Sequence, residues 1–413
     1  MSTFGIEEEF QFLHPVTLRP ADVGAEVYDS LRATPAWHEV THREFLASQV
    51  EHASTVFTRL EDARSALHGF RAAVARHAAA LGVTAASIGT PPDTTPFPSI
   101  SAVDRYQRIV QNMDGVIADH QVSGLHVHVG IPNREAGVIV LNAVRPWLPL
   151  FTALSSNSPL WRAGDTGHDS WRTVLLRRWT TSGSPPSFVD AADYDRRIQR
   201  LLGIGGTVDL GVIMWDVRLS EHLPTIEFRM ADAQLDSQTT LLIAALCRAF
   251  VGHALGVPGA QSAAVAASAD MPSELLSAAL LHSAHFGMRA QVFDPIIGGL
   301  APAHESLAGL VRLLEPELHA AGDLDSVTET VERIGADGTG AERQRAAFRR
   351  AGLSGLRRLL TDTLTAARAT GSDRPAPVPA ADLIGVPVGS VAPPPDPTEL
   401  LVRAGAGPGL RPR

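Results

Sequence analysis

The chain has 413 residues, of which 45% are hydrophobic and 19% charged, values that are ordinary for a soluble globular protein. This composition excludes collagen-like, coiled-coil and fully disordered proteins. The net charge of −9 argues against a nucleic-acid-binding protein, since such proteins need a basic surface to neutralise phosphates. The single cysteine, Cys247, excludes an intramolecular disulfide.

Lysine is absent from the sequence, so all 35 basic residues counted as Lys and Arg are arginines. This excludes the Walker A loop, the protein kinases and the Schiff-base enzymes, because each depends on a lysine amine. If the protein handles phosphates, the positive charge must come from arginines, helix N-termini or metal ions.

The N-terminal residues lack the basic and then apolar layout of a signal peptide. The longest stretch without Asp, Glu, Arg or Lys, residues 249–269, is interrupted by His253, Pro258 and Gln261, so it does not predict a membrane span. We therefore expect a cytoplasmic protein with no membrane partner.

Residues 4–13 alternate as a β-strand does. The alternation places Glu7 and Glu9 on one face, and Glu8 on the opposite, apolar face with Ile6. Two like charges so close together repel each other. A solvated strand face and a site for a hard divalent cation, which favours carboxylate oxygens, are the two alternatives.

Two further acidic residues, Glu44 and Glu51, flank an apolar run. Their separation of seven places them on opposite faces of a regular strand, so a bulge or bend is needed if both serve one site. Exposed acids beside an apolar run and ligands of a shared cation remain open alternatives.

Residues 122–129 also alternate as a β-strand, and glycines bracket its motif GLHVHVG, which runs from Gly124 to Gly130. His126 and His128 share one face of it, and Val127 and Val129 share the other. The imidazoles are either satisfied core groups or ligands of a metal or nucleotide.

Residues 225–230 alternate again, with Glu227 and Arg229 on one face and Phe228 on the other. Upstream, the segment WDVR ends at Arg218. An acid and a guanidinium on one face form either an ordinary ion pair or a metal carboxylate beside an arginine that grips a phosphoryl group.

The apolar periodicity predicts helices over residues 60–81, 236–255 and 274–285, and a mostly helical part from about 303 to 370. The glycines at 203–206 predict a turn rather than a nucleotide fingerprint. The Pro-, Ala- and Gly-rich residues 371–413 predict a largely disordered tail, in which residues 400–403 dock locally. We expect one catalytic domain over residues 1–370.

Taken in chain order, these motifs resemble those of the type 2 glutamate-cysteine ligase family, the carboxylate-amine ligases, over about residues 4–350. The motifs are GIEEEF from Gly5, Glu44 to Glu51, GLHVHVG from Gly124, DVR from Asp216, PTIEFR from Pro224 and GTGAERQR from Gly338. Further similar stretches are LSSNSP from Leu154, DTG from Asp165, SWR from Ser170 and RWTTSG from Arg178.

The resemblance implies an α+β, glutamine-synthetase-like catalytic domain, in which a curved, mainly antiparallel sheet has the active site on its inner face and helices outside. It implies metal ligands at Glu7, Glu9, Glu44, Glu51, His126 and Glu227, and a phosphate-contacting arginine at Arg229. We further assign Glu227 and Arg229 to catalysis, His128 and Arg218 to ATP or phosphate binding, and Arg172 to substrate binding.

The activity implied is an ATP-dependent ligase that uses Mg²⁺ or Mn²⁺ and joins glutamate, through a γ-glutamyl phosphate, to cysteine or another amine. A set of metal ligands beside a phosphate-binding arginine is needed because a carboxylate must become an acyl phosphate before an amine can attack it. One alternative is a ligase with a different amine acceptor in a secondary pathway. Another is a catalytically silent metal- or nucleotide-binding regulator. The oligomeric state stays open between a monomer and a homo-oligomer.

Overall fold

Residues 2–256 and 271–366 of the computed structural model are described here, and they fold around one central sheet. Within these residues seven strands form the sheet in the order β2-β3-β1-β5-β9-β8, with β4 paired to the end of β1. All neighbouring strands of the sheet are antiparallel. The fold is α+β with an antiparallel sheet, as expected.

The strands of the sheet are β1 (Phe4–Leu13), β2 (Thr41–Arg43), β3 (Gln49–Ala53), β4 (Thr84–Ala86), β5 (Gly124–Gly130), β8 (Val217–Leu219) and β9 (Thr225–Asp232). Two short hairpins lie outside it, formed by β6 (Leu160–Trp161) with β7 (Gly164–Asp165) and by β10 (Gln291–Asp294) with β11 (Gly299–Pro302).

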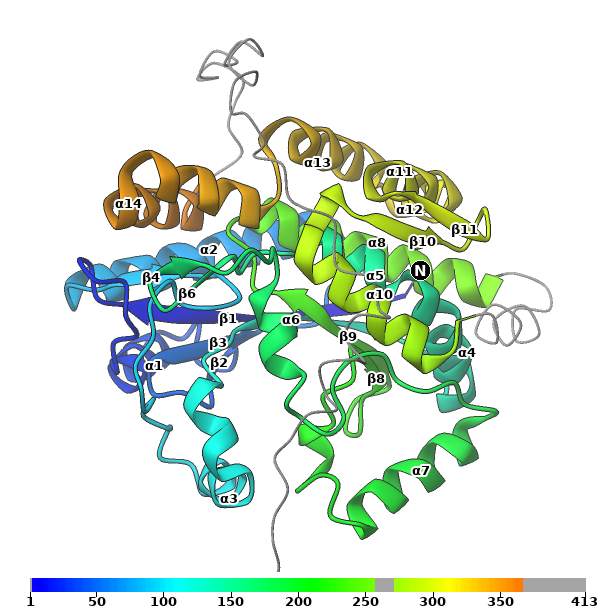
Figure 1. The fold of residues 1–413 in the computed structure, drawn as a ribbon, viewed down its shortest axis with the longest axis horizontal. Coiled ribbons are helices and arrows are strands. Elements are labelled where there is room, and N and C mark those ends of the chain that lie inside the picture. The colour runs from blue at the N-terminus through cyan, green and yellow to red at the C-terminus, as the bar shows by residue number, and fades with distance from the viewer. Residues whose placement is uncertain (1, 257–270, 367–413) are drawn as a thin grey trace, which may run out of the picture. The chain divides into compact units, whose positions relative to one another are not determined.

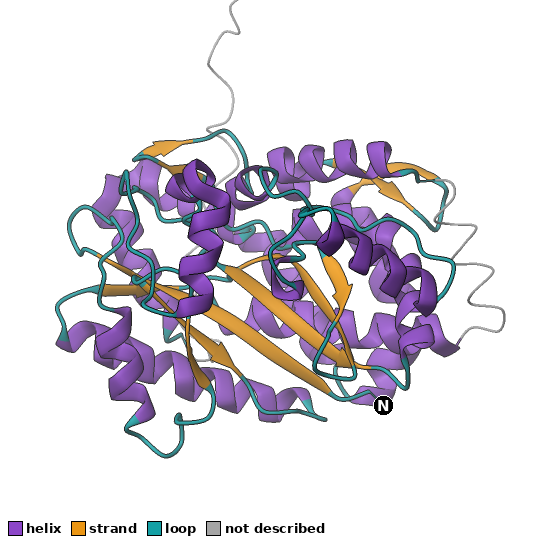
Figure 2. Ribbon diagram, turned by 90° about the horizontal axis from the view of Figure 1, so that it is seen from below, coloured by secondary structure: helices purple, strands orange, loops and turns teal. Residues whose placement is uncertain are grey.

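The helices are α1 (Gly24–Arg32), α2 (Leu60–Ala80), α3 (Asp104–Met113), α4 (Arg134–Val144), α5 (Leu148–Leu154), α6 (Trp171–Leu176), α7 (Ala191–Gly203), α8 (Ser237–Gly256), α10 (Ser273–Phe286), α11 (Ala303–Leu313), α12 (Glu315–Ala321), α13 (Leu324–Asp337) and α14 (Gly340–Leu364). Figure 1 shows α2 and α8 over one face of the sheet, and α3 and α7 beyond the other face. Seen from that second side, the strands remain visible between the helices (Figure 2).

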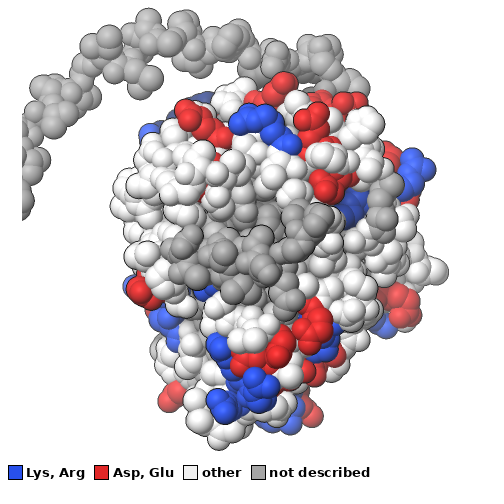
Figure 3. All heavy atoms as spheres, turned by 90° about the vertical axis from the view of Figure 1, so that its right-hand side faces the viewer, with Lys and Arg blue, Asp and Glu red and all other residues white. Residues whose placement is uncertain are grey.

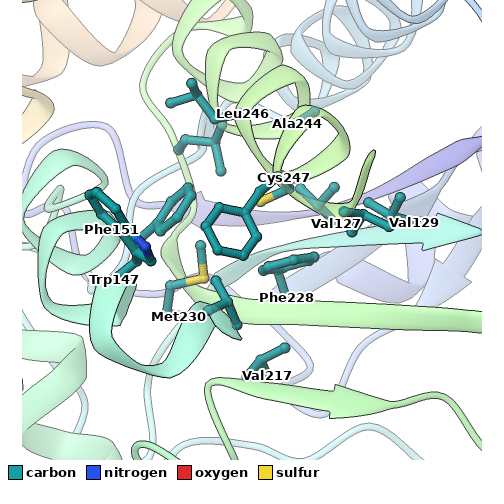
Figure 4. Packing of buried hydrophobic residues seen from close by; sticks show 14 of the residues in the cluster. Val127, Val129, Trp147, Phe151, Val217, Phe228, Met230, Ala244, Leu246 and Cys247 are labelled. Atoms are coloured by element: carbon teal, nitrogen blue, oxygen red, sulfur yellow. The ribbon is translucent and has the colours of Figure 1, made fainter. Parts of the chain in front are cut away.

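The apolar face of the sheet packs against the helices above it. Val127 of β5 and Phe228 and Met230 of β9 are buried in one large cluster, in which Figure 4 shows Phe151 of α5 and Cys247 of α8 beside them. Fully burying a side chain of this size contributes about 1.5–3 kcal/mol. The two-residue alternation therefore fixes which face of the sheet carries the polar side chains.

The predicted strands and helices are present with small shifts of their ends. The strands expected over 4–13, 122–129 and 225–230 are confirmed as β1, β5 and β9, and the helices expected over 60–81, 236–255 and 274–285 as α2, α8 and α10. The chain after α2 turns at Gly82, which has the positive φ (72°) that favours glycine beyond a helix end. The glycines at 203–206 form the predicted turn after α7.

The predicted helical part after residue 303 is divided into four helices, and α14 is kinked at Ala351 and Gly352. The tail over residues 371–413, with the expected docking of residues 400–403, lies outside the described residues. The limits of the predicted catalytic domain, 1–370, therefore stay a prediction.

Two helical segments, Arg134–Leu154 and Ser237–Gly256, are long and apolar enough to span a bilayer by length and composition alone. In the structure, 89% and 78% of their most apolar windows are buried inside the protein. That is the pattern of core helices. On the surface drawn in Figure 3, the described arginines are interspersed with acidic residues, and this part of the face shows no extended basic surface.

Glu8 points to the apolar side of β1, as the alternation predicts, and forms a buried ion pair there. Both it and Arg71 of α2 are 1% exposed, with Arg71 Nη2 2.5 Å from Glu8 Oε1 and Nε 3.1 Å from Oε2. Thr240 of α8 donates a hydrogen bond to the same carboxylate, and Arg71 also donates to two backbone carbonyls. These bonds join β1 to both covering helices.

Replacing Glu8 by Gln should destabilise the protein without touching the polar face of the sheet. The substitution leaves the Arg71 guanidinium buried without its counter-charge, which costs about 3–5 kcal/mol of unfolding free energy. The control Glu61→Gln removes a carboxylate that is 63% exposed and should change stability by about 0.5 kcal/mol or less. Urea denaturation of both variants checks this, and equal midpoints would contradict it.

Candidate active site

A cavity of about 420 Å³ lies on the polar face of the sheet. Strands β1, β3, β5 and β9 contribute most of its acidic and imidazole side chains, and α3 and residues 210–223 contribute to its walls. All the site residues predicted from the sequence line this cavity: Glu7, Glu9, Glu44, Glu51, His126, His128, Arg172, Arg218, Glu227 and Arg229. Their individual roles stay predictions.

Strand register brings together residues that are far apart in the sequence. Glu7 on β1 lies opposite His126 on β5, and Glu9 lies opposite Glu51 on β3. Directly opposite residues of antiparallel strands have their Cβ atoms about 4.5–5.5 Å apart, so their side chains meet on one face. The central strand β1 therefore carries an acid–imidazole pair beside an acid–acid pair.

The other side of β5 continues this row of polar pairs. His128 lies opposite Glu227 on β9, and Glu227 lies opposite Arg218 on β8. The register of β5 and β9 shifts at His126, where a bulge adds a residue on the β9 side. Arg229 lies at this irregularity and hydrogen-bonds Glu227.

One potential set of metal ligands, the Glu7 group, consists of Glu7, His126 and Glu227, whose ligand atoms lie within 4.8 Å of one another. His126 Nδ1 lies 3.0 Å from Glu7 Oε2, and His128 Nε2 lies 3.2 Å from Glu7 Oε1. Burial raises the pKa of Glu7, but the hydrogen bonds and charges of both histidines outweigh it and hold the pKa well below its usual value. Glu7 is therefore a carboxylate that is ready to bind a cation.

The second set, the Glu9 group, consists of Glu9, Glu44 and Glu51, with ligand atoms again within 4.8 Å. Burial and the nearby charge of Glu44 raise the pKa of Glu9 to about 8. Burial and the charges of Glu7, Glu44 and Glu9 raise the pKa of Glu51 well above its usual value. The protein therefore lacks enough positive charge here, among its described residues, to keep all three groups ionised at neutral pH.

A turn between β2 and β3 brings Glu44 to the same side as Glu51. Glu44 follows the end of β2, and its backbone carbonyl accepts a hydrogen bond from Ser101 Oγ at 2.5 Å. Leu46, two residues later, forms an isolated β-bridge with Ile100. The bend that the sequence spacing required is thus present.

The donor atoms of both groups fit a hard divalent cation. Carboxylate oxygens suit Mg²⁺ and Mn²⁺, and they make up all of the Glu9 group and two of the three ligands of the Glu7 group. The pKa of Glu9 is raised, which indicates that the described protein groups do not supply enough positive charge to balance the carboxylates of its group. The Glu7 group and the Glu9 group are therefore the residues that would hold such ions.

Two arginines surround Glu227. Arg218 contacts it through Nε at 2.7 Å and Nη2 at 3.2 Å, while Arg218 Nη1 donates to three backbone carbonyls of residues 210–213 at 3.0–3.1 Å. Burial raises the pKa of Glu227, but the charges of Arg229 and Arg218 outweigh it and lower the pKa. Because Arg218 is held on all sides, it orients Glu227 rigidly.

Arg172 lies in the wall of the cavity and is 4% exposed. Its Nη1 donates to the carbonyl of Met230 at 3.4 Å and its Nη2 to that of Arg229 at 3.2 Å. The carboxylate of Asp232 lies 3.9 Å away. A Cβ at Gly124 would come within 2.6 Å of Arg172 Nη2, so only glycine leaves room for the guanidinium.

A buried hydrogen-bond network holds the segment that carries Arg172. Asp232 at the end of β9 accepts hydrogen bonds from Ser158 Oγ at 2.7 Å and Ser170 Oγ at 2.9 Å. Ser158 Oγ in turn accepts the backbone N–H of Arg172 at 3.0 Å. The start of α6 is thereby tied to the sheet, which fixes where the Arg172 side chain begins.

The motif GTGAERQR lies outside the cavity and binds the segment before α6 that supports Arg172. Arg345 Nε lies 3.0 Å from both carboxylate oxygens of Asp165, and Gln344 Nε2 donates to Asn157 Oδ1 at 2.6 Å. Three motifs that are separate in the sequence are thus joined. They support the cavity wall rather than line the cavity.

Sequence reasoning missed several residues of the cavity. Arg105 and Tyr106 come from α3, Trp179 follows α6, and His120 precedes β5. They belong to no alternating pattern, because none of them is in a strand. The resemblance of the stretch RWTTSG was the one signal for Trp179, and no comparable signal marked His120.

Comparison with known proteins shows the family of this chain. Residues 3–362 match the glutamate-cysteine ligase family 2. The chain belongs to this family. It is thus a ligase of the carboxylate-amine type.

Two curated relatives carry provisional names as glutamate–cysteine ligases. Glutamate–cysteine ligase 2-1 of Saccharopolyspora erythraea is 38% identical over 350 residues, which cover 84% of this chain and 90% of the relative. Glutamate–cysteine ligase 2-2 of Frankia alni is 40% identical over 310 residues, which cover 75% of this chain and 79% of the relative.

Two solved structures are similar in fold. A bifunctional glutathione synthetase from Pasteurella multocida matches with a TM-score of 0.64 at 15% identity, over 88% of this chain and 52% of that one, so this chain spans about half of that protein. Glutamate–cysteine ligase from Francisella tularensis in complex with AMP matches with a TM-score of 0.56 at 12% identity, over 89% of each chain. At these identities the likeness concerns the fold alone.

Replacing Glu51 by Gln should weaken the response of the protein to divalent cations. Without metal the variant should melt no lower than the parent, because an amide of similar shape replaces a half-buried acid that no described arginine neutralises. Saturating Mg²⁺ or Mn²⁺ at 100 times its Kd should stabilise the parent by about 2.7 kcal/mol and the variant by much less. Thermal melts in EDTA and in excess metal measure both effects.

The matched control is Glu39→Gln, which changes a carboxylate that is 87% exposed and remote from the cavity. It should respond to metal as the parent does. If Glu51→Gln and the parent gained equally from metal, the Glu9 group would not be a cation site.

Proposed function

We propose that the protein is an ATP- and Mg²⁺-dependent ligase that joins the side-chain carboxylate of glutamate to an amine, with cysteine as the first acceptor to test. Membership of the glutamate-cysteine ligase family 2 supports the reaction class. The AMP in the Francisella tularensis relative supports an adenine nucleotide as co-substrate. The observation that carries the proposal is that two acidic groups and Arg229 line the same cavity.

The chemistry explains why such a cavity is needed. In the first step an oxygen of the glutamate γ-carboxylate forms a bond to the γ-phosphorus of ATP, the bond from that phosphorus to the bridging oxygen breaks, and ADP leaves. In the second step the amine nitrogen forms a bond to the acyl carbon, the bond from that carbon to the phosphate oxygen breaks, and phosphate leaves. The acceptor ammonium loses two protons, one of which remains on the phosphate.

The first step brings two anions together, so it needs dense positive charge. Divalent cations in the Glu7 group and the Glu9 group would, when bound, neutralise the phosphates and the developing charge. Of the arginines beside Glu227, Arg229 has the freer guanidinium, because Arg218 is held by the carboxylate and by three carbonyls. We therefore assign the contact with the transferring phosphoryl group to Arg229.

Glu227 and His128 set the position of this arginine. Glu227 is 2% exposed and hydrogen-bonds Arg229, and His128 Nε2 lies 3.9 Å from Glu227 Oε1. His128 Nδ1 also pairs with Thr225 Oγ1 at 3.0 Å, which sets the orientation of the ring. We therefore assign to His128 an indirect role in phosphate binding. Its ring helps to orient Glu227, which in turn positions Arg229.

ADP release over a panel of amines with glutamate and Mg-ATP tests the proposal. One acceptor should increase ADP release well above the rate without an amine, and the product should contain a new amide to the γ-carbon of glutamate. Glu227→Gln should abolish the increase. A protein that binds ATP but releases no ADP with any acceptor would instead be a silent nucleotide-binding regulator.

Replacing Arg229 by Lys should lower kcat more than it raises the KM for ATP. Lysine keeps the charge but loses the planar fork, so the loss falls on the transition state. Removing one preorganised donor typically costs about 10²–10³ in kcat, or about 2.7–4 kcal/mol. Steady-state kinetics with varied ATP measure both constants.

The matched control for this substitution is Arg134→Lys at the start of α4, where the arginine makes a surface pair with Asp195. Its kcat should remain within about twofold of the parent. If Arg229→Lys and Arg229→Ala both kept parental kcat, Arg229 would be only the ion-pair partner of Glu227.

A further inference from the structure

His120 lies at the aromatic end of the cavity, between the short 3-10 helix Asp114–Asp119 and β5. Its ring packs edge-on against Trp179, with centroids 4.7 Å apart, and against Phe45 at 5.7 Å. All three rings line the cavity. The imidazole is therefore held in one place by two aromatic side chains.

The contact with Trp179 also determines which ring nitrogen carries the proton. Trp179 Nε1–H donates to His120 Nδ1 at 3.0 Å. An indole nitrogen is only a donor, so Nδ1 must be an unprotonated acceptor, and the proton of the neutral ring is on Nε2. No described residue makes a hydrogen bond to Nε2, which leaves this N–H for a ligand in the cavity.

The surroundings keep this imidazole neutral. Burial, followed by the charges of Arg178 and Arg172, lowers the pKa of His120 to about 3. The ring is thus suited to donate a fixed hydrogen bond and unsuited to shuttle a proton near neutral pH.

Arg172 also lines the cavity, and it lies near enough to His120 for its positive charge to lower the pKa of that imidazole. The other arginines that line the cavity are paired with acids, Arg105 with Asp209 and both Arg218 and Arg229 with Glu227. Among the described arginines of the cavity, Arg172 alone donates no hydrogen bond to a carboxylate. Asp232 lies 3.9 Å away, so this guanidinium is less closely paired than the other three and can attract a further anion.

An anionic substrate group has few other places to bind. The acidic groups on β1, β3 and β9 would repel a carboxylate, and their cations would be engaged by phosphates. A carboxylate next to Arg172 and His120 would receive a charge-assisted bond and a neutral N–H bond, beside an apolar ring. This combination matches a carboxylate on a small organic molecule.

We propose that the Nε2–H of His120 and the guanidinium of Arg172 together bind a carboxylate of the glutamate substrate. His120 is then a specificity-determining residue, and Trp179 is a positioning residue that fixes its tautomer. The inference rests on the proposed ligase function for the identity of the substrate. The tautomer and the binding of the carboxylate can be measured without that function.

The first experiment measures ADP release while the amino-acid substrates are varied at saturating Mg-ATP. His120→Ala should raise the KM for glutamate by about 10–100-fold, as expected for losing a hydrogen bond to a charged group. The kcat and the KM for ATP should remain within about threefold. His120→Asn, which keeps an N–H donor, should recover part of the loss.

Trp179→Phe gives the second variant, because it keeps an aromatic ring but removes the indole N–H. Its KM should lie between those of the parent and His120→Ala. In ¹⁵N spectra of the imidazole, the parent should show the Nε2–H tautomer of His120, and Trp179→Phe should show a mixture. The control His304→Ala changes a histidine that is 72% exposed and should leave all constants unchanged.

Three results would overturn the inference: an unchanged amino-acid KM in His120→Ala, an increase confined to the KM for ATP, or a proton on Nδ1 in the parent. Equilibrium binding of L-glutamate to the Mg²⁺-loaded protein separates this inference from the proposed function. If no amine supports ADP release but His120→Ala weakens glutamate binding tenfold or more, the carboxylate site is supported. The proposed ligase function is then contradicted. Equal glutamate binding by both proteins, or none by either, overturns the site.

Discussion

Repulsion between carboxylates on one face of an antiparallel sheet is the constraint on which the rest of the site depends. Neighbouring positive groups relieve this repulsion at some of the carboxylates and not at others. Glu7 is compensated by two imidazoles and Glu227 by two guanidiniums, so both remain ionised. Glu9, Glu44 and Glu51 have no comparable partners among the described residues, and their pKa values are raised. The demand for external cations is therefore concentrated at one end of the row.

Such a row requires a sheet whose register cannot slip. A shift of β1 by one residue would bring Glu8 to the cavity and Glu7 into the apolar core. The buried pair of Glu8 with Arg71 opposes this shift, because both charges would lose their partners. On β9, Asp232 performs a similar task through Ser158 and the start of α6. Buried polar groups outside the cavity thus protect the arrangement of the polar groups that line it.

The sequence was most informative where a two-residue period is visible. Alternation along β1 separates Glu7 from Glu8 correctly, and alternation along β9 places Glu227 with Arg229, because each strand has one buried apolar face. The position of Glu44 could not be predicted from alternation alone. Its approach to Glu51 depends on a turn, and the odd separation of the two residues shows that a turn is needed but not where it lies. For Glu44 and Glu51 the resemblance to a family supplied what the local pattern could not.

His120 and Tyr106 could not be found in this way, because their place in the cavity depends on tertiary packing. His120 is oriented by Trp179, which lies 59 residues later in the chain, and no local period records such a contact. Tyr106 reaches the cavity from α3, where its hydroxyl donates to the carbonyl of Arg43. Side chains that shape the substrate end of a site are often placed by loops and short helices, which evade pattern-based prediction.

Because the sequence contains no lysine, the basic side chains of the cavity other than its imidazoles are guanidiniums. A guanidinium has five N–H donors in a fixed plane, so it can hold one partner and still present donors to another. Arg229 can therefore remain bonded to Glu227 while it contacts a phosphoryl group. Arg172 donates its hydrogen bonds to backbone carbonyls and has the Asp232 carboxylate 3.9 Å away, so it has donors left for a second anion. Two arginines that are fixed by different partners can thus hold two anions apart until they react, which is the requirement of a ligase that must bring a carboxylate and a phosphate together.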